Sequence, residues 1–172
     1  MVEIVTEKFK LRPLNQADAE VFHLGINTRQ IAEDTTIPTP WELNSIKWWI
    51  DYINNAALQI PIRELHFAIE VENMLAGSVG IINIDGHKAE IGYWLKENYA
   101  GRGIMSEVID IVANYAFEKM NLKRLFAPIL PHNKASGRVL EKNGFIIEGV
   151  LRKYYFKDGK YVDAICYAKI VE

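Results

Sequence analysis

Residues 98–106 read NYAGRGIMS and precede the most regular amphipathic stretch of the chain, residues 104–120. Gly101 and Gly103 let the backbone approach a ligand closely, because neither carries a side chain. The first turn of the helix that follows has unpaired N–H groups, and the helix dipole favours negative charge there. Gly103 is a weaker cap than Ser or Asp, which leaves these donors free, and Arg102 adds a positive charge. The segment predicts an anion site; a plain glycine turn that begins a helix is the alternative.

Hydrophobic periodicity on both sides of this turn switches between the periods of helices and strands. Apolar residues recur at i, i+3, i+4 and i+7 within residues 46–53, which predicts an amphipathic helix. Turn signals at Glu72-Asn73 and Asp85-Gly86 separate three antiparallel strands. The element order β-αα-βββ-α-β-α-ββ predicts one α+β domain over residues 1–172. The expected elements are a strand within 3–13, a helix capped by Asn15, a loop at 35–40, a helix at 46–53, strands at 65–71, 75–84 and 89–95, a helix at 104–120, a strand at 124–129, a helix at 133–143 and two long strands around Asp158-Gly159.

The composition is that of an ordinary globular protein, with 172 residues of which 49% are hydrophobic and 24% charged. These values exclude disorder, collagen-like repeats and coiled coils. The net charge of −2 offers no basic excess for nucleic acid or an anionic membrane, so neither is an expected partner. No apolar run approaches ~18 residues, and the N-terminal stretch lacks the pattern of a signal peptide. A single cysteine, Cys166, cannot close an internal disulfide and suits the cytoplasm.

Residues 98–103 fit the pattern Q/R-x-x-G-x-G/A at both glycines and depart from it at Asn98. With four longer strings, they resemble the GNAT superfamily of N-acetyltransferases, and within it the RimJ and RimL type that acetylates the N-terminal alanine or serine of ribosomal proteins. The resemblance implies a three-layer α/β/α fold with a central, mostly antiparallel, splayed mixed β-sheet; a homodimer is left open. The strings are AEIGYWL at 89–95, GRGIMSEVI at 101–109, PHNKASGRVLEKNGF at 131–145 and YVDAICYAKI at 161–170.

The same resemblance implies acetyl-CoA as a co-substrate, without a metal. The glycine turn would hold the pyrophosphate of acetyl-CoA, and the strand that ends at Trp94-Leu95 would pair through its backbone with the pantetheine arm. Asn133 would contact the pantetheine, and Ser136, close to the thioester sulfur, would protonate or hydrogen-bond the departing thiolate. Helix capping by Asn133 is the structural alternative, and both roles can coexist. The expected cofactor-binding residues are Trp94, Leu95, Gly101, Arg102, Gly103, Ile104, Met105, Ser106, Asn133 and Ser136.

Acetyl transfer also needs a neutral amine. An N-terminal α-amine has a pKa of ~7.7–8.0 and is partly neutral at physiological pH, whereas a lysine side chain has a pKa near ~10.4 and is not. An α-amine therefore needs less help from the enzyme to lose its proton. Glu90, on the strand that leads into the glycine turn, is the first candidate base, acting directly or through a water. A solvated strand residue or an ion-pair partner is the alternative interpretation. Tyr155 is the second candidate, although a tyrosine is a poor resting base.

Other conspicuous side chains receive plainer interpretations. Trp48 and Trp49 lie on or beside the apolar stripe at 46–53 and are expected in the core. Trp41 follows a loop with two prolines. The resemblance implies that the segment joining the first two helices borders the acceptor entrance, where Trp41 or Glu33-Asp34 would meet a cationic acceptor. Cys166 lies among alternating apolar residues and is expected to be a buried small side chain. No metal-ligand spacing occurs among His66, His87 and His132.

The sequence therefore predicts an acetyl-CoA-dependent N-acetyltransferase that transfers the acetyl group directly to a primary amine in a ternary complex. The preferred acceptor is the N-terminal amine of a ribosomal or other protein, and a backbone N–H near Trp94-Leu95 stabilises the oxyanion. A small-amine acetyltransferase acting on a polyamine, drug or amino acid is one alternative. A CoA-binding module without catalysis is another, because Asn98 and Tyr155 depart from the expected residues. A purely structural subunit is the third.

Overall fold

A computed structural model describes residues 2–172 of the chain. Its strands are β1 (Ile4–Val5), β2 (Lys10–Arg12), β3 (Leu65–Val71), β4 (Met74–Asp85), β5 (Lys88–Leu95), β6 (Arg124–Ile129), β7 (Ile146–Lys157) and β8 (Lys160–Ile170). They form one eight-stranded sheet in the order β1-β2-β3-β4-β5-β6-β8-β7. Neighbouring strands are antiparallel except β5 and β6, which are parallel.

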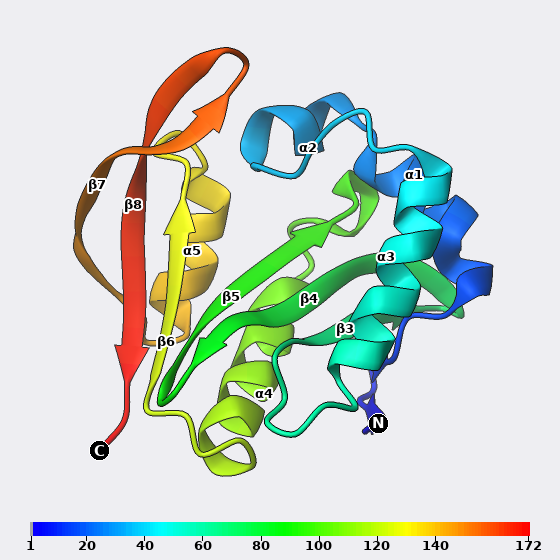
Figure 1. The fold of residues 1–172 in the computed structure, drawn as a ribbon, viewed down its shortest axis with the longest axis horizontal. Coiled ribbons are helices and arrows are strands. Elements are labelled where there is room, and N and C mark those ends of the chain that lie inside the picture. Colours follow the sequence, from blue (N-terminus) through cyan, green and yellow to red (C-terminus); the bar gives the residue numbers. More distant parts are fainter. Residues whose placement is uncertain (1) are drawn as a thin grey trace.

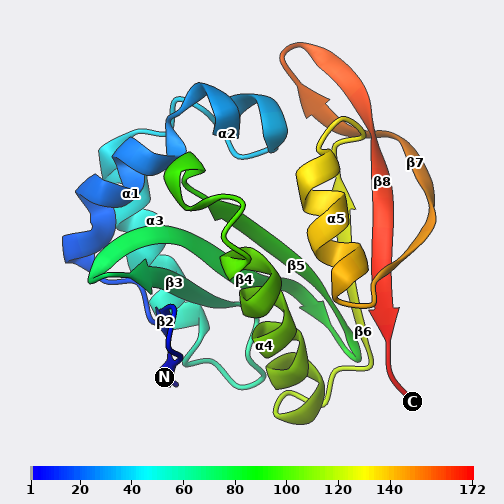
Figure 2. The ribbon, with the colours of Figure 1, turned by 180° about the vertical axis from the view of Figure 1, so that it is seen from behind.

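The helices cover both faces of this sheet. They are η1 (Gln16–Asp18), α1 (Ala19–Ile26), α2 (Arg29–Asp34), α3 (Leu43–Ala56), η2 (Glu97–Tyr99), α4 (Ile104–Glu118) and α5 (Lys134–Lys142). Helices α1 and α3 lie in front of the sheet (Figure 1), and α4 and α5 cover the opposite face (Figure 2). The predicted α+β fold, three layers around a mostly antiparallel mixed sheet, is confirmed.

Strand alternation divides the apolar residues between two cores, one on each face. On β3, Phe67 and Ile69 join the core beneath α4, which includes the fully buried Val112. Ala68, between them in sequence, joins the second core with Phe22 of α1 and residues of α3. Successive side chains of a strand point to opposite faces, so one apolar strand supplies both layers.

The N-terminal strand prediction is wrong in its extent. The sequence predicts one strand within 3–13, whereas β1 and β2 form an antiparallel pair joined by a turn. Thr6 closes this turn, because its Oγ1 accepts from the N–H groups of Lys8 at 3.2 Å and Phe9 at 3.0 Å. Local side-chain to backbone hydrogen bonds of this kind replace ladder bonds and let the chain reverse.

Helix α2 occupies a segment to which the sequence assigned no element. Thr28 caps it, with Oγ1 accepting from the N–H of Ile31 at 3.4 Å. Ile31 is the one fully buried residue of this six-residue helix. A helix this short has no repeating apolar stripe, so periodicity does not reveal it.

Trp48 corrects another expectation, because it is 68% exposed and not in the core. The buried stripe of α3 contains Ile46, Ile50 and Ile53. Trp48 is two positions after Ile46 and therefore about 200° around the helix from it. Its ring stacks on Tyr52 with the centroids 5.5 Å apart. Trp49 is half-buried and packs against the core, as expected.

The sheet opens between β5 and β6, which confirms the predicted splay. Both strands run on past their last paired residues, to Leu95 and Ile129, and diverge towards their C-terminal ends (Figure 1). Beyond Glu90, β5 has no sheet partner on the β6 side. The paired residues are Lys88↔Arg124, Ala89↔Leu125 and Glu90↔Phe126.

Candidate active site

Two cavities lie at the opening of the sheet. The turn cavity, of about 180 Å³, borders the glycine turn and the N-termini of α4 and α5. The sheet cavity, of about 290 Å³, lies over the face of the sheet that α1 and α3 cover, with Ser78, Gly80 and Gly92 as its floor. The cavities share wall residues and are therefore adjacent. The shared residues are Asp34, Thr35, Tyr93, Trp94, Asn133 and Ser136.

The glycine turn presents free backbone donors to the turn cavity. Gly101 has φ 74° and Gly103 has φ 78°, the left-handed region that glycine adopts readily. The first intrahelical bond of α4 runs from the N–H of Glu107 to the carbonyl of Gly103. Among the described residues, no side chain caps the N-terminus of α4. The N–H groups of residues 104–106 are thus available to an anion, which fits a pyrophosphate.

Most of the predicted cofactor-binding residues come together at this cavity. Two of them, Arg102 and Ser106, are not among the residues that line its wall. The guanidinium of Arg102 lies 3.5 Å from the carboxylate of Glu72 and over the ring of Tyr99. The hydroxyl of Ser106 accepts from Asn143 Nδ2 at 3.3 Å. Those that line the cavity are Trp94, Leu95, Gly101, Gly103, Ile104, Met105, Asn133 and Ser136.

Strand β5 presents an unpaired backbone edge to the opening. The N–H of Lys96 donates to the carbonyl of Ala76 on the β4 side at 2.9 Å. Backbone groups alternate in direction along a strand. Those of Ile91, Tyr93 and Leu95 therefore face the side that β6 has left. They are donors and acceptors with which an extended ligand can pair, and the pairing of the strand end at Trp94-Leu95 with a ligand stays a prediction.

A pair of hydroxyls stands where the two cavities meet. Tyr93 Oη and Ser136 Oγ are 2.7 Å apart. Asn133 caps α5, as its Oδ1 accepts from the N–H of Ser136 at 3.0 Å, so capping uses the backbone of Ser136 and leaves its hydroxyl available. Burial raises the pKa of Tyr93 well above its usual range, which keeps it protonated. Sequence reasoning missed Tyr93, although strand alternation places it on the α5 side of the sheet.

Glu90 lies half-buried in the wall of the sheet cavity. Burial raises the pKa of its carboxyl, and a hydrogen bond from Asn83 Nδ2 at 2.9 Å partly opposes that rise. None of the ion pairs formed within the described part of the chain includes Glu90, so the ion-pair interpretation has no partner. A carboxylate with a raised pKa and no competing cation is suited to accept a proton.

Tyr155, the second candidate base, lines the same cavity but acts as a donor. Its hydroxyl donates to the carbonyl of Pro128 at 3.0 Å. Burial raises the pKa of Tyr155, and the nearby charge of Glu90 raises it further. The phenol stays protonated at neutral pH, in agreement with the expectation of a poor resting base.

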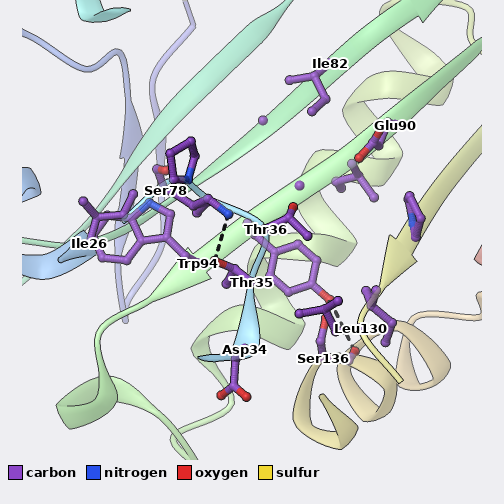
Figure 3. Close-up of a pocket in the computed structure, with 18 of the residues that line it drawn as sticks. Ile26, Asp34, Thr35, Thr36, Ser78, Ile82, Glu90, Trp94, Leu130 and Ser136 are labelled. Carbon is purple, nitrogen blue, oxygen red and sulfur yellow. Dashed lines mark hydrogen bonds between the residues drawn. The ribbon is translucent and has the colours of Figure 1, made fainter. Parts of the chain in front are cut away.

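Hydrogen bonds from across the opening hold the C-terminal end of helix α2 and form a clasp. Carbonyls at that end, residues 32–35, accept hydrogen bonds from three side chains across the opening: His132 and Asn133 between β6 and α5, and Lys157 of β7. Cations and polar donors at a helix C-terminus satisfy its free carbonyls. The clasp holds Asp34 and Thr35 in the wall that both cavities share (Figure 3).

Replacing Lys157 by methionine should loosen this clasp. The ammonium group bonds the carbonyls of Ala32 and Thr35. We expect faster hydrogen exchange of the α2 amides and a KM for the acceptor raised several-fold, because the shared wall loses its support. Lys160, exposed on the same hairpin, is the matched control: Lys160→Met should change neither quantity. Unchanged exchange in Lys157→Met would show that the clasp does not hold α2.

Aromatic side chains from the helical layer complete the sheet cavity. Trp41 lies in its wall, and its backbone N–H donates to Asn27 Oδ1 at 2.7 Å. Trp49 and His66 also line it, and neither was predicted to. Cys166 is buried in β8, as expected of a small apolar side chain. In the described residues no three His, Cys, Asp or Glu side chains group as metal ligands.

Comparison with known proteins identifies the family to which these features belong. The family described as the acetyltransferase (GNAT) domain matches residues 8–146. The chain belongs to the GNAT acetyltransferases. It is accordingly an N-acetyltransferase of the GNAT type that uses acetyl-CoA. Over residues 2–172, the helices are all too short or too polar to span a membrane.

Individual relatives agree with this family. The ribosomal-protein-serine acetyltransferase of Escherichia coli is 33% identical over 62% of this chain and 60% of its own length. The crystal structure of the ribosomal-protein-S5-alanine acetyltransferase from Vibrio fischeri superposes with a TM-score of 0.88 and 25% identity, covering 99% of this chain and 97% of that one. The microcin C7 self-immunity acetyltransferase MccE, solved with acetyl-CoA and AMP, has a TM-score of 0.86 and 25% identity, covering 96% and 94%.

Proposed function

We propose that this GNAT enzyme acetylates the N-terminal amine of a protein, with ribosomal proteins as the first substrates to test. The observation that carries the proposal is the meeting of the two cavities at Tyr93 and Ser136. One cavity has free backbone donors for a phosphate, and the other has the carboxylate of Glu90. Such a site can hold a cofactor and an acceptor at once, which direct transfer requires.

The residues of the turn cavity fit acetyl-CoA. The N–H groups at the start of α4 would bind its pyrophosphate, and the free edge of β5 near Leu95 would pair with the amides of its pantetheine arm. A Cβ at Gly101 or Gly103 would have no neighbour within 4 Å, so space for a ligand exists on this side. When bound, acetyl-CoA supplies an acetyl group activated as a thioester.

Two groups of this chain would then handle the protons. Glu90 would take the proton of the acceptor amine, directly or through a water. Ser136, hydrogen-bonded to the protonated Tyr93, would donate to the sulfur as the thiolate leaves. Backbone N–H groups of β5 near Trp94-Leu95 would stabilise the negative charge that develops on the carbonyl oxygen. Tyr155 would hold the Pro128 segment of the wall.

An α-amine is the acceptor that this arrangement suits best. Its pKa of ~7.7–8.0 leaves part of it neutral at physiological pH, so one modest base is enough. Two relatives described above are named for acetylating ribosomal proteins, which supports this choice. The proposed place of action is the cytoplasm, and a homodimer stays a prediction.

The test is to incubate the protein with acetyl-CoA and acceptors, and to follow both free thiol and the acetylated product by mass spectrometry. Peptides with free N-termini should release thiol well above buffer hydrolysis and carry the acetyl group on the α-amine. Preference for spermidine or free amino acids would favour the small-amine alternative. Tight CoA binding, with no thiol released in the presence of any acceptor, would favour a non-catalytic CoA-binding module.

Ser136→Ala should lower kcat by about ten- to a hundredfold, because the leaving thiolate loses a hydrogen-bond donor. Its melting temperature should stay close to that of the wild type, since the cap bond uses the backbone N–H of Ser136. Asn133→Ala is the contrasting variant: it removes the cap and should cost about 0.5–2 kcal/mol of stability. If Ser136→Ala lost stability but kept its kcat, its hydroxyl would have a structural role only.

A further inference from the structure

The floor of the sheet cavity is made of small residues, and its hollow lies at Gly92, because the ring of His66 occupies the side-chain position of Gly80. Gly80 and Gly92 face each other directly across β4 and β5, and Ser78 lies next to them on the same face of the sheet. A Cβ added to Gly92 would meet a single atom within 4 Å, Ile82 Cδ1 at 3.8 Å. The backbone of Gly92 does not need glycine for its φ. Its lack of a side chain therefore keeps the space above it open.

One end of this cavity is aromatic. Phe22 contacts Trp41 and Trp94 edge to face, with ring centroids 6.1 Å and 5.1 Å apart, and Trp49 lies 5.3 Å from both Phe22 and Trp41. All four side chains line the cavity. Contacts among them hold the wall rigid, so it offers a preformed apolar surface.

The polar end lies opposite. Figure 3 shows Glu90 and Ile82 on one side of the cavity, and Ile26 with Trp94 on the other. The carboxylates in the walls are those of Glu90 and Asp34, and no Lys or Arg is among the described lining residues. A free carboxylate on the acceptor therefore finds no Lys or Arg partner here.

We propose that the acceptor carries one bulky apolar group, aromatic or branched aliphatic, beside its primary amine. For a protein substrate this means an N-terminal Phe or Leu in preference to Ala or Ser; the inference rests on the proposed function. The amine points to the place where the two cavities meet, with Glu90 taking its proton directly or through a water, and the apolar group fills the space between Gly92 and the aromatic wall. A cavity of about 290 Å³ accommodates such a group, whereas a methyl or hydroxymethyl side chain leaves its apolar wall without contacts.

A peptide series that differs in its first residue, Phe, Leu, Ala, Ser or Lys, tests this preference. We expect kcat/KM for Phe or Leu to exceed that for Ala by about ten- to a hundredfold, the range that apolar pockets provide. Gly92→Val should abolish most of this ratio, because its side chain occupies the hollow. Trp49→Ala should also reduce the ratio by opening the aromatic wall. Its neighbour Trp48, which is exposed, gives the matched control: Trp48→Ala should leave the ratio unchanged.

Product binding separates this proposal from the proposed function. Calorimetry in the presence of CoA should show tighter binding of N-acetylphenylalaninamide than of N-acetylalaninamide, and Gly92→Val should remove the difference. This result would support the apolar pocket even if no peptide were acetylated. Equal binding of the two amides, or equal or better turnover of Ala, Ser or spermidine that Gly92→Val does not alter, would overturn it while leaving acetyl transfer intact.

Discussion

Glu90→Gln is expected to lower kcat by about 10²- to 10⁴-fold, the usual contribution of a positioned general base. Glutamine keeps the shape and the hydrogen bond from Asn83 but cannot take a proton at neutral pH. The affinity for CoA should not change, because Glu90 lies in the wall of the sheet cavity and outside that of the turn cavity. Thiol release at saturating acceptor measures the first quantity, and calorimetry measures the second.

The pH dependence of kcat gives this prediction a second readout. Glu90 must be ionised to accept a proton, and burial raises its pKa, so kcat should fall as the pH drops through a value above the ~4.3 of an ordinary glutamate. Glu90→Gln should lack this acidic limb. Asn83→Gly removes a hydrogen bond that favours the ionised form and should move the limb to higher pH; Gly also suits the positive φ of Asn83, 52°. An unchanged limb in Glu90→Gln would assign the base to another group.

Gly103→Val is expected to weaken CoA binding by about a hundredfold. Its side chain would stand where the pyrophosphate approaches the first turn of α4, and losing one or two charge-assisted hydrogen bonds at ~1.5–3 kcal/mol each accounts for a change of this size. The melting temperature should also fall, because a branched residue at φ 78° is strained. Calorimetry with CoA on the folded variant measures the affinity.

Gly86 supplies the control for that strain. It has φ 58° in the turn between β4 and β5, with open space around it, and it does not line the turn cavity. Gly86→Val should therefore lose stability in the same way and still bind CoA like the wild type. Equal loss of affinity in both variants would mean that strain, not contact with the pyrophosphate, explains Gly103→Val.

Local patterns were enough to predict most of the fold. The amphipathic stripe at 46–53, the hairpin turns and the glycine turn at 101–103 correspond to elements that the structure contains. The exceptions are short or locally stabilised segments. Helix α2 has one buried residue, and Thr6 redirects the chain by hydrogen bonds of its own hydroxyl. Neither feature alters hydrophobic periodicity over a window long enough to read.

The candidate site likewise has residues that the sequence predicted and residues that only the structure revealed. The family resemblance implied that Ser136 and the glycine turn belong to one site, and Glu90 was chosen because its strand leads into that turn. The sequence motifs could not indicate Tyr93, because its role depends on the hydroxyl of a residue 43 positions later. Nor could they indicate the clasp, in which Asn133 bonds the carbonyl of Asp34, 99 residues away.

By itself, the sequence determined most of the segments that form strands and helices, and which turn leaves N–H groups free for an anion, because both depend on neighbouring residues. Only the tertiary structure decided that two cavities meet at Tyr93 and Ser136, and that Gly92, opposite Gly80, leaves a hollow in the floor of the sheet cavity. The physical reason is that strand register, the divergence of β5 from β6 and the packing of α2 across it are set by contacts between distant parts of the chain.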